Sequence, residues 1–285
     1  MLELIDITKI YKGQKRAVDG LTLRLGPGLV GLLGPNGAGK SSLLRIAATV
    51  TRPTRGEVRF DGGDAIARPG PLRRALGYLP QDFGVYPHLT GHEFLTYLAA
   101  VRGLSHRSAR ARIGELLDLV NLGHAAKRQL GGYSGGMLRR IGIAQALLAD
   151  PRIIIVDEPT AGLDPQERVR FRNLLSDLSA DRSVLLSTHI VSDVESVATR
   201  IVVVTAGRIR FDGEPTDLVR HVAGHVWELT VPPAELDGIQ QRMPVTRLIR
   251  AGDHVKVRVL ATQRPAPDAV PASPDLEDAY LAVAR

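Results

Sequence analysis

The sequence predicts an α/β fold with a parallel sheet, and three observations support this. Short apolar segments that end in turn or polar residues alternate with amphipathic helical patterns, which is typical of parallel strands joined by helices. A wholly helical pattern interrupts them between about residues 88 and 149, and the pattern of apolar and polar residues changes again after about residue 216. We therefore expect a main domain over residues 1–216, with a helical subdomain at about 85–149, and an accessory α+β extension over 217–285.

Five apolar segments are expected to form buried strands of the sheet. They are residues 29–34, 75–80, 152–159, 183–189 and 200–207. Each ends in turn or polar residues, so the polar groups collect at the carboxyl ends of the strands. Open α/β sheets bind their ligands at that edge, which is where we expect the functional site.

The inserted helices and the C-terminal extension have their own local signals. Thr90 and Glu93 form a capping box that opens one helix, and a second amphipathic helix follows over residues 106–123. In the extension, residues 225–231 and 253–260 alternate like half-exposed strands. A linker rich in proline and alanine is expected over residues 264–274, and a terminal helix over residues 275–284.

The composition excludes several classes of protein and of site. The chain has no cysteine, which excludes disulfides, thiolate metal sites and cysteine nucleophiles. No run approaches the roughly 18 apolar residues of a membrane helix, and the first residues lack the pattern of a secretion signal, so we expect a cytoplasmic chain. The net charge of +7 would suit a nucleic-acid partner, but the basic residues are dispersed and aromatic residues make up only 4%. We expect no nucleic-acid binding.

A complete phosphate-binding motif, "GPNGAGKS", occupies residues 34–41 between an expected strand and an expected helix. Backbone amides of such a loop wrap around phosphates at a helix N-terminus, Lys40 supplies a positive charge to the outer phosphates, and Ser41 offers a hydroxyl to Mg²⁺. Both flanks argue against an ordinary glycine turn. The nucleotide-binding residues expected here are Gly34, Pro35, Asn36, Gly37, Ala38, Gly39, Lys40, Ser41 and Ser42.

Two carboxylates follow the apolar run "IIIV" in the segment "IIIVDE", residues 153–158. Strand period places Asp157 and Glu158 on opposite sides, so that one faces Mg²⁺ and the other faces an attacking water. Behind a complete phosphate loop, this pattern assigns the metal to Asp157 and the role of general base to Glu158.

A second glycine-rich stretch, "YSGGM" at residues 133–137, precedes an expected amphipathic helix. A helix N-terminus carries unsatisfied N–H groups and a partial positive charge, so Ser134, Gly135 and Gly136 are suited to bind an oxyanion. The alternative is that Ser134 only caps the helix.

The series of motifs resembles the nucleotide-binding subunit of ABC transporters over residues 1 to about 216. The phosphate loop, Gln81, "YSGGM", "IIIVDEP", "AGLD" at 161–164 and His189 occur in the order and approximate spacing of that family. The resemblance implies a P-loop NTPase with a RecA-like parallel core and an N-terminal antiparallel β region. It also implies ATP and Mg²⁺ as ligands, ATP hydrolysis, and a homodimer or paired subunit formed around two ATP molecules.

The resemblance also assigns roles that the residues alone leave open. It implies that Tyr11 stacks on adenine, that Gln81 reaches Mg²⁺ and the helical insertion, and that His189 bonds the terminal phosphate and orients water. Without the resemblance, Tyr11 would be read as a packing residue, Gln81 as a solvated loop residue and His189 as a structural residue. Asp164 is a good helix N-cap on local grounds, and the family adds that its loop crosses to the partner.

In the family, the "SGG" loop of one subunit closes on nucleotide held by the other. The resemblance thus implies that Ser134, Gly135, Gly136 and Asp164 act in trans. The commonest family form is LSGGQ, whereas Tyr133 and Met137 stand at its first and last places here. Met137 removes an amide that could reach nucleotide or a neighbouring loop, so we expect closure affinity to be affected more than chemistry.

The expected biological role is ATP-driven transport, with export favoured. A separate membrane permease would dock near residues 82–94, which would place the subunit on the inner face of the cell membrane. The "YSGGMLRR" and "EPTAGLDP" stretches and the final "LEDAYLAVA" resemble bacterial drug- and polysaccharide-type exporters. Non-transport ABC ATPases usually show two cassettes or a long coiled coil, and GTPases or small-molecule kinases lack "SGG" and "AGLD". This sequence shows neither a second cassette nor a long coiled coil, and it contains both "SGG" and "AGLD". Both rival classes are therefore disfavoured.

Overall fold

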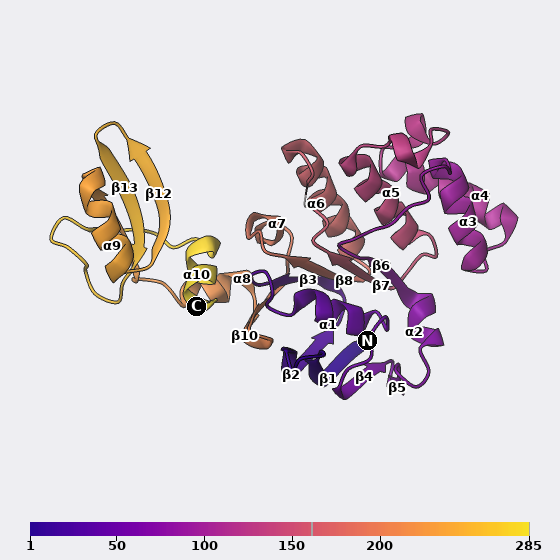
Figure 1. Ribbon diagram of the computed structural model, residues 1–285, viewed down its shortest axis with the longest axis horizontal. Coiled ribbons are helices and arrows are strands. Elements are labelled where there is room, and N and C mark those ends of the chain that lie inside the picture. The colour runs from indigo at the N-terminus through magenta and orange to yellow at the C-terminus, as the bar shows by residue number, and fades with distance from the viewer. Residues whose placement is uncertain (161, 285) are drawn as a thin grey trace.

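The computed structural model describes residues 1–160 and 162–284, and its strands form three sheets (Figure 1). The central sheet has the order β10-β9-β3-β8-β7-β6, with parallel pairing from β9 through β6 and an antiparallel edge strand β10. Its strands are β3 (Gly28–Leu33), β6 (Leu76–Leu79), β7 (Ile153–Asp157), β8 (Ser183–Thr188), β9 (Arg200–Thr205) and β10 (Arg208–Gly213). The five expected strands and their parallel arrangement are confirmed.

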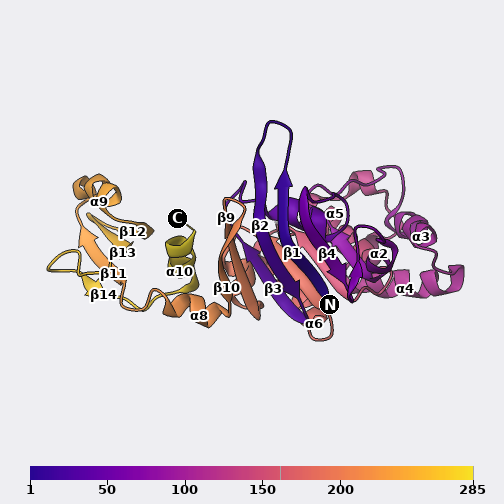
Figure 2. The ribbon, with the colours of Figure 1, turned by 90° about the horizontal axis from the view of Figure 1, so that it is seen from below.

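An antiparallel sheet with the order β2-β1-β4-β5 forms the N-terminal region. Its strands are β1 (Leu2–Ile10), β2 (Arg16–Leu25), β4 (Arg55–Phe60) and β5 (Gly63–Asp64). The hairpin between β1 and β2 projects beyond the sheet in Figure 2. Helix α1 (Lys40–Ala47) lies between this sheet and the central sheet, and α2 (Gly70–Ala75) leads into β6.

The central strands are buried on both faces, and alternate residues of the same strand enter different cores. On β3, Leu29 and Leu33 belong to the core that also includes residues of the inserted helices, whereas Val30 and Leu32 belong to the core that includes α1 and the antiparallel sheet. β7 alternates in the same way. This burial explains why the strands read as nearly continuous apolar runs in the sequence.

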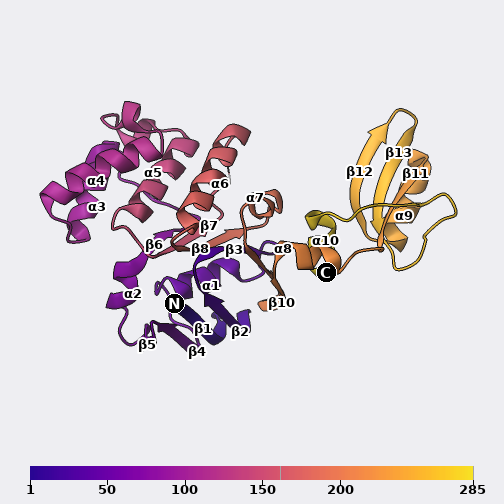
Figure 3. The ribbon, with the colours of Figure 1, turned by 180° about the vertical axis from the view of Figure 1, so that it is seen from behind.

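The helical insertion contains α3 (Gly91–Val101), α4 (His106–Leu119) and α5 (Gly135–Leu147), with short 3-10 turns at Gly123–Ala125 and Leu130–Gly132. The expected capping box is present, since the Thr90 hydroxyl accepts from the Glu93 amide and the Glu93 carboxylate accepts from the Thr90 amide. Helices α6 (Pro165–Ser179) and α7 (Ser192–Glu195) follow β7 and β8. Figure 3 shows α3 and α4 at the end of the molecule opposite the C-terminal sheet.

The C-terminal extension forms a four-stranded antiparallel sheet with the order β12-β13-β11-β14. Its elements are α8 (Pro215–Arg220), β11 (Val226–Val231), a 3-10 turn (Pro233–Glu235), α9 (Leu236–Arg242), β12 (Val245–Ala251), β13 (His254–Leu260), β14 (Val270–Pro271) and α10 (Leu276–Val283). The expected strands over 225–231 and 253–260 and the terminal helix are confirmed. The expected linker over 264–274 includes β14, so part of it is paired in the sheet rather than free.

Helix α10 returns from the small sheet to the main body, and it lies beside α8 between the two in Figures 1 and 3. Leu276, Ala279 and Tyr280 of α10 belong to the same apolar core as Leu218 of α8. None of the helices in the described ranges has the length and apolarity that crossing a bilayer requires. Ala161, the first residue of the "AGLD" stretch, and Arg285, the last residue of the extension, lie outside the described residues.

Candidate functional site

The phosphate loop joins the carboxyl end of β3 to the N-terminus of α1, as its motif predicts. Gly37 and Gly39 have φ angles of 82° and 101°, a left-handed region that favours glycine. A Cβ at Gly39 would collide with the carbonyl of Ala17, and one at Gly34 with the carbonyl of Val204. The loop is therefore tightly packed from behind. Its outer rim is formed by the exposed residues Pro35, Asn36 and Gly37, while Ala38 is buried.

Lys40, the first residue of α1, is nearly fully buried inside the loop. Its Nζ donates to the carbonyls of Gly34 at 2.6 Å and Pro35 at 3.2 Å, and it lies 3.4 Å from Oε1 of Glu158. The ammonium group is thus held where a phosphate would enter the loop. Ser41 and Ser42 follow on the first turn of α1 and are half-buried.

The two carboxylates lie beside Lys40, but not by the strand geometry that the sequence suggested. Strand β7 ends at Asp157, and Glu158 has a left-handed backbone with φ of 49°. The expectation of two strand residues on opposite faces was therefore wrong, because the chain turns sharply between them. The turn aims Glu158 so that Oε2 lies 2.7 Å from Nδ1 of His189, while Oε1 faces Lys40.

The Asp157 side chain is buried, with 1% of its surface exposed. Burial raises the pKa of this carboxyl, and the charge of Glu158 adds to the effect, whereas the nearby Ser41 and Ser187 hydroxyls and the charge of Lys40 oppose it. Its Oδ1 is buried with no hydrogen-bond partner. A buried acceptor without a donor is costly, so this oxygen is suited to a cation.

The donor set near Asp157 fits Mg²⁺. No group of three or more His, Asp or Glu side chains within residues 1–160 and 162–284 is arranged to hold a metal ion. Mg²⁺ does not require one, because it is commonly held by one or two protein oxygens, water and substrate phosphates. Asp157 and the hydroxyl of Ser41 supply oxygens of the right kind.

Tyr11 and Gln81 lie on two loops beside the phosphate loop. Tyr11 follows β1, is 39% exposed, and donates from its hydroxyl to Oγ of Ser42 at 3.2 Å. Nζ of Lys9 lies 5.2 Å from its ring centroid. Gln81 is exposed after β6, and its backbone carbonyl accepts from Arg139 of α5 at 2.7 Å. The ring of Tyr11 is thus available to a ligand bound in the loop.

The second glycine-rich stretch forms the N-terminus of α5. Ser134 is the N-cap residue, and its hydroxyl accepts from the amide of Met137 at 3.2 Å, so Ser134 does cap the helix, whether or not it also binds an anion. Ser134 and Gly135 are exposed. Within the described ranges, no hydrogen bond or ion pair joins this stretch or Asp164 to residues 34–42 of the same chain. Their action in trans stays a prediction.

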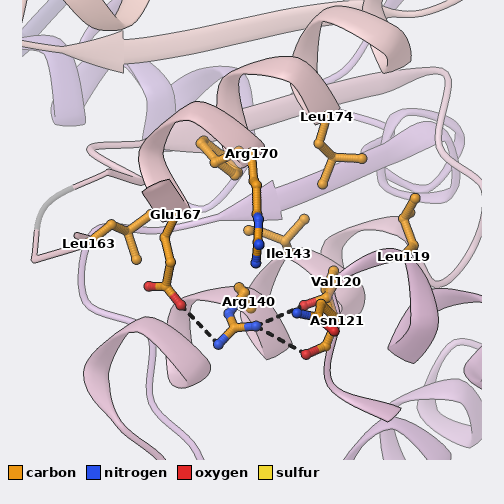
Figure 4. A pocket seen from close by; sticks show the side chains of 10 residues that line it. Leu119, Val120, Asn121, Arg140, Ile143, Leu163, Glu167, Arg170 and Leu174 are labelled. Carbon is orange, nitrogen blue, oxygen red and sulfur yellow. Dashed lines mark hydrogen bonds and ion pairs between the residues drawn. The ribbon is translucent and has the colours of Figure 1, made fainter. Parts of the chain in front are cut away.

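Asp164 caps α6, since its Oδ1 accepts from the amide of Glu167 at 2.8 Å. Glu167 in turn pairs with Arg140 of α5 at 2.9 Å, and Arg140 also donates to the carbonyls of Val120 and Asn121 after α4. Figure 4 shows these bonds at the edge of a mostly apolar cavity of about 70 Å³ between α4, α5 and α6. Arg140 therefore links the loop that contains Asp164 to the helix that begins at Ser134.

The two departures from the common family pattern are both explained by packing. Tyr133 is buried and donates from its hydroxyl to the carbonyl of Ala125 at 2.8 Å. Met137 is 8% exposed, and its sulfur accepts from the Arg128 guanidinium at 2.9 Å. The Met137 side chain thus points into the protein, and not toward the surface where an amide would reach nucleotide.

Sequence reasoning missed two groups of residues near the site. Arg139 reaches from α5 to the carbonyls of the Gln81 loop and of Glu158. The buried carboxylate of Asp193 accepts from the hydroxyls of Thr160 and Thr188, and so joins the segments after β7 and β8. The only sequence signals were the paired arginines in "MLRR" and an aspartate four residues after His189, and both patterns are common on helix surfaces.

Comparisons with known proteins show the family of the chain. Residues 18–161 match the family model described as ABC transporter. The chain is 37% identical over 250 residues to YxlF of Bacillus subtilis (strain 168), an uncharacterized ABC transporter ATP-binding protein, with 87% of this chain and 82% of YxlF covered. It is 38% identical over 252 residues to the daunorubicin/doxorubicin resistance ATP-binding protein DrrA of Streptomyces peucetius, with 88% of this chain and 74% of DrrA covered.

Solved structures give the same result. The structure of the ATP-binding subunit of an ABC transporter superimposes with a TM-score of 0.71 at 30% identity, covering 78% of this chain and 92% of that chain. The dimeric structure of MJ0796, a bacterial ABC transporter cassette, gives 0.70 at 28% identity and covers 75% and 98%. A further dimeric structure of MJ0796 is a post-hydrolysis state bound to ADP and Pi, with a TM-score of 0.69 at 28% identity, covering 75% and 98%.

Proposed function

Because this chain belongs to the ATP-binding proteins of ABC transporters, we propose that its site binds and hydrolyses ATP to power transport, in the direction of export, through a separate membrane permease. The observation that carries the proposal is the meeting of Lys40, Asp157, Glu158 and His189 at the phosphate loop. These residues lie at or after the carboxyl ends of three neighbouring strands of the central sheet, β3, β8 and β7.

ATP binding follows from the loop and its neighbours. The backbone amides at the N-terminus of α1 face anions, and the Lys40 ammonium exchanges its carbonyl partners for phosphate oxygens. The hydrogen bond of Tyr11 to Ser42 beside the phosphate loop supports a role for its ring in stacking on the adenine base. ATP thereby replaces the protein groups that satisfy Lys40 in the free chain.

Hydrolysis is assigned to Glu158 with the help of His189. The Glu158 carboxylate removes a proton from a water, the water oxygen bonds to the terminal phosphorus, and the bond to the bridging oxygen breaks to give ADP and inorganic phosphate. Nδ1 of His189 lies 2.7 Å from Oε2 of Glu158 and holds the carboxylate in place. When ATP is bound, His189 would instead form its hydrogen bond to the terminal phosphate. The Glu158 amide donates to the carbonyl of Ser187 at 3.0 Å, which supports this position of its backbone.

Mg²⁺ is proposed to bind through Asp157 and Ser41, with Gln81 approaching from the opposite loop. The unpartnered Oδ1 of Asp157 supports this assignment. The bound cation would neutralise charge on the phosphate oxygens as the terminal bond breaks. Ionised Asp157 is disfavoured by burial in the free chain, so the cation also relieves that cost.

Two copies of the chain are proposed to close on two ATP molecules. In each copy Ser134 and Gly135 are exposed at the positive end of α5, and Asp164 is exposed at the start of α6. Gly136 lies on the first turn behind them, packed against Glu167. These groups would complete the phosphate site of the partner, which gives a symmetric pair with two composite sites.

A separate permease is proposed to dock on the helical insertion and so to hold the chain at the inner face of the membrane. An open groove of about 740 Å³ runs between α3 and α4, lined by His92, Tyr97, Leu104 and Arg110 among others. Exposed Tyr86 and Tyr97 meet edge to face with ring centroids 5.8 Å apart. Exposed aromatic side chains beside a groove suit the insertion of a partner helix.

Export is proposed from the relatedness to DrrA, a daunorubicin/doxorubicin resistance ATP-binding protein. A drug molecule is the corresponding class of cargo in this proposal. We further propose that residues 1–216 form the ATPase domain, with the helical subdomain at about 85–149, and that residues 217–285 form an accessory extension.

The proposal is tested with Glu158→Gln, which keeps the volume of the side chain but removes its basicity. We expect ATP binding to persist while turnover falls by about 10²–10⁴, the range for loss of a positioned base. ATP should then trap a dimer, measured by light scattering with and without nucleotide. Lys40→Ala is the comparison, and it should lose nucleotide binding itself. Wild-type turnover in Glu158→Gln would contradict the assignment of the base.

A further inference from the structure

Arg139 connects three parts of the site through one guanidinium group. It lies on α5, five residues after the N-cap Ser134. Its Nη1 donates to the carbonyls of Pro80 at 3.1 Å and Gln81 at 2.7 Å, and its Nη2 donates to the carbonyl of Glu158 at 3.2 Å. The helix that begins with the "SGG" stretch is thereby tied to the Gln81 loop and to the segment after β7.

The partners of Arg139 are backbone carbonyls and not carboxylates. No ion pair of Arg139 within 4.0 Å occurs in the described part of the chain. Burial lowers the pKa of its guanidinium, and the negative charges of Asp82, Asp157 and Glu158 oppose this effect. A charged donor with a rigid planar fork is suited to hold several carbonyls in a fixed arrangement.

One of these carbonyls belongs to a strained residue. Glu158 has a φ of 49° and precedes Pro159, and a left-handed backbone at a residue that is not glycine persists only when its surroundings hold it. Two bonds do so here. The Glu158 amide donates to the carbonyl of Ser187 at 3.0 Å, and the Glu158 carbonyl accepts from Arg139. The same turn aims the carboxylate at Lys40 and His189.

We propose that Arg139 is a positioning residue, which holds the backbone of Glu158 in the catalytic orientation and couples it to α5 and to the Gln81 loop. The inference rests on the proposed function, in which Glu158 is the general base. It goes further, because it states that a shift of α5 or of the Gln81 loop changes the aim of the base. Nucleotide binding is left to the phosphate loop, to which Arg139 makes no hydrogen bond among the described residues.

The first test measures ATP affinity and turnover separately in Arg139→Met and Arg139→Lys. Methionine keeps the packing but donates nothing, and we expect kcat to fall about 10²-fold, the scale of a catalytic group misplaced by 1 Å. Lysine can bond only part of the carbonyl set, so its loss should be intermediate. The dissociation constant of a fluorescent ATP analogue should change less than about twofold, since this corresponds to under roughly 0.4 kcal/mol.

The matched control is Arg102→Met. Arg102 also donates from Nη1 to a backbone carbonyl, that of Leu76 at 3.1 Å, and burial also lowers the pKa of its guanidinium. Leu76 begins strand β6, whereas the Gln81 loop follows the other end of that strand. Arg102→Met should therefore keep the wild-type kcat. Equal losses in the Arg102 and Arg139 variants would overturn the positioning role.

A double-mutant cycle with Glu158→Gln separates positioning from general structural support. If Arg139 acts through Glu158, Arg139→Met should cause no further loss of kcat in the Glu158→Gln background. A further loss of about 10²-fold would mean that Arg139 acts elsewhere and would overturn the inference. A different result would contradict the proposed function, namely wild-type turnover in Glu158→Gln alone.

Discussion

The contact between α10 and the C-terminal sheet provides a prediction whose size follows from the structure. The carboxylate of Asp278 on α10 accepts from Nε and Nη2 of Arg258 on β13 at 3.0 and 2.8 Å, from the Thr246 hydroxyl at 2.6 Å and from the Asp275 amide at 3.1 Å. Asp278 is 1% exposed and Arg258 is 11% exposed. The perturbation is Asp278→Asn, which keeps the volume and removes the charge.

The expected cost is about 2–3 kcal/mol at neutral pH. Removing one partner of a buried ion pair costs about 3–5 kcal/mol, because the other charge is left buried. Here Arg258 retains Oε1 of Glu228 at 2.8 Å and the carbonyl of Ser273, and asparagine still offers an acceptor to Thr246. We therefore expect a value below that range, near the cost of an unsatisfied buried group.

The pH dependence of this cost has a definite sign. Burial alone would raise the pKa of Asp278, but the hydrogen bonds from Arg258, Thr246 and the backbone outweigh it and hold the pKa below its ordinary value. The stabilisation is thus complete above the unfolded value of about 3.9 and is lost as the pH falls through the lower folded value. Wild type and Asp278→Asn should differ at pH 7 and converge in strong acid.

Hydrogen exchange of the α10 amides, followed by mass spectrometry, measures the loss of local stability of α10 in Asp278→Asn. The matched control is Arg247→Gln, because Arg247 pairs with Asp275 and Glu277 of the same segment at 2.8 and 3.2 Å but is 45% exposed. Exposed pairs contribute about 0.2–1 kcal/mol, so the control should lose much less protection. Wild-type protection of α10 in Asp278→Asn at pH 7 would refute the reasoning.

Three further predictions concern the nucleotide site. Asp157→Asn removes a buried charge, so it should raise the melting temperature of the nucleotide-free chain by about 2–4 °C per kcal/mol of burial cost relieved. The same variant should abolish Mg²⁺-dependent hydrolysis. A lower melting temperature would count against a burial cost at Asp157. Mixing Lys40→Ala with Ser134→Ala chains should restore roughly one working site per heterodimer, measured as ATPase rate, and no recovery would exclude a composite site. Met137→Gln should leave ATP-driven dimerisation unchanged in light scattering, because position 137 faces the interior; tighter dimers would show that its side chain reaches the partner.

The parts of the fold that the sequence predicted depend on interactions close along the chain. Strands such as 29–34 and 200–207 were recognised because burial on both faces requires continuous apolar runs. The phosphate loop was recognised because its glycines satisfy backbone requirements within eight residues, as the φ of 101° at Gly39 shows. The Thr90 capping box and the Asp164 N-cap are local in the same sense.

The parts that could not be predicted depend on partners far apart in the sequence. Strand β12 (Val245–Ala251) pairs with β13 but carries mostly exposed side chains, so it shows no apolar run or clean alternation. Arg139 finds its carbonyl partners 58 and 59 residues before it and 19 residues after it. The sharp turn at Glu158 is also set by tertiary bonds, which is why strand period gave the wrong geometry for the carboxylate pair.

The charges of the site indicate why ATP binding and dimer formation would be linked. Within one chain, the positive charges of Lys40 and Arg139 lie near two carboxylates, Asp157 and Glu158. An incoming triphosphate adds about four negative charges, and like charges in a partly buried site repel strongly. Mg²⁺ offsets part of this excess, and the exposed N-terminus of α5 offers a further partial positive charge, to which no described residue of the same chain's phosphate loop is hydrogen-bonded. On the proposed arrangement, the terminal phosphate supplies the negative charge that attracts the partner's Ser134 region, so ATP binding would favour closure of the two copies.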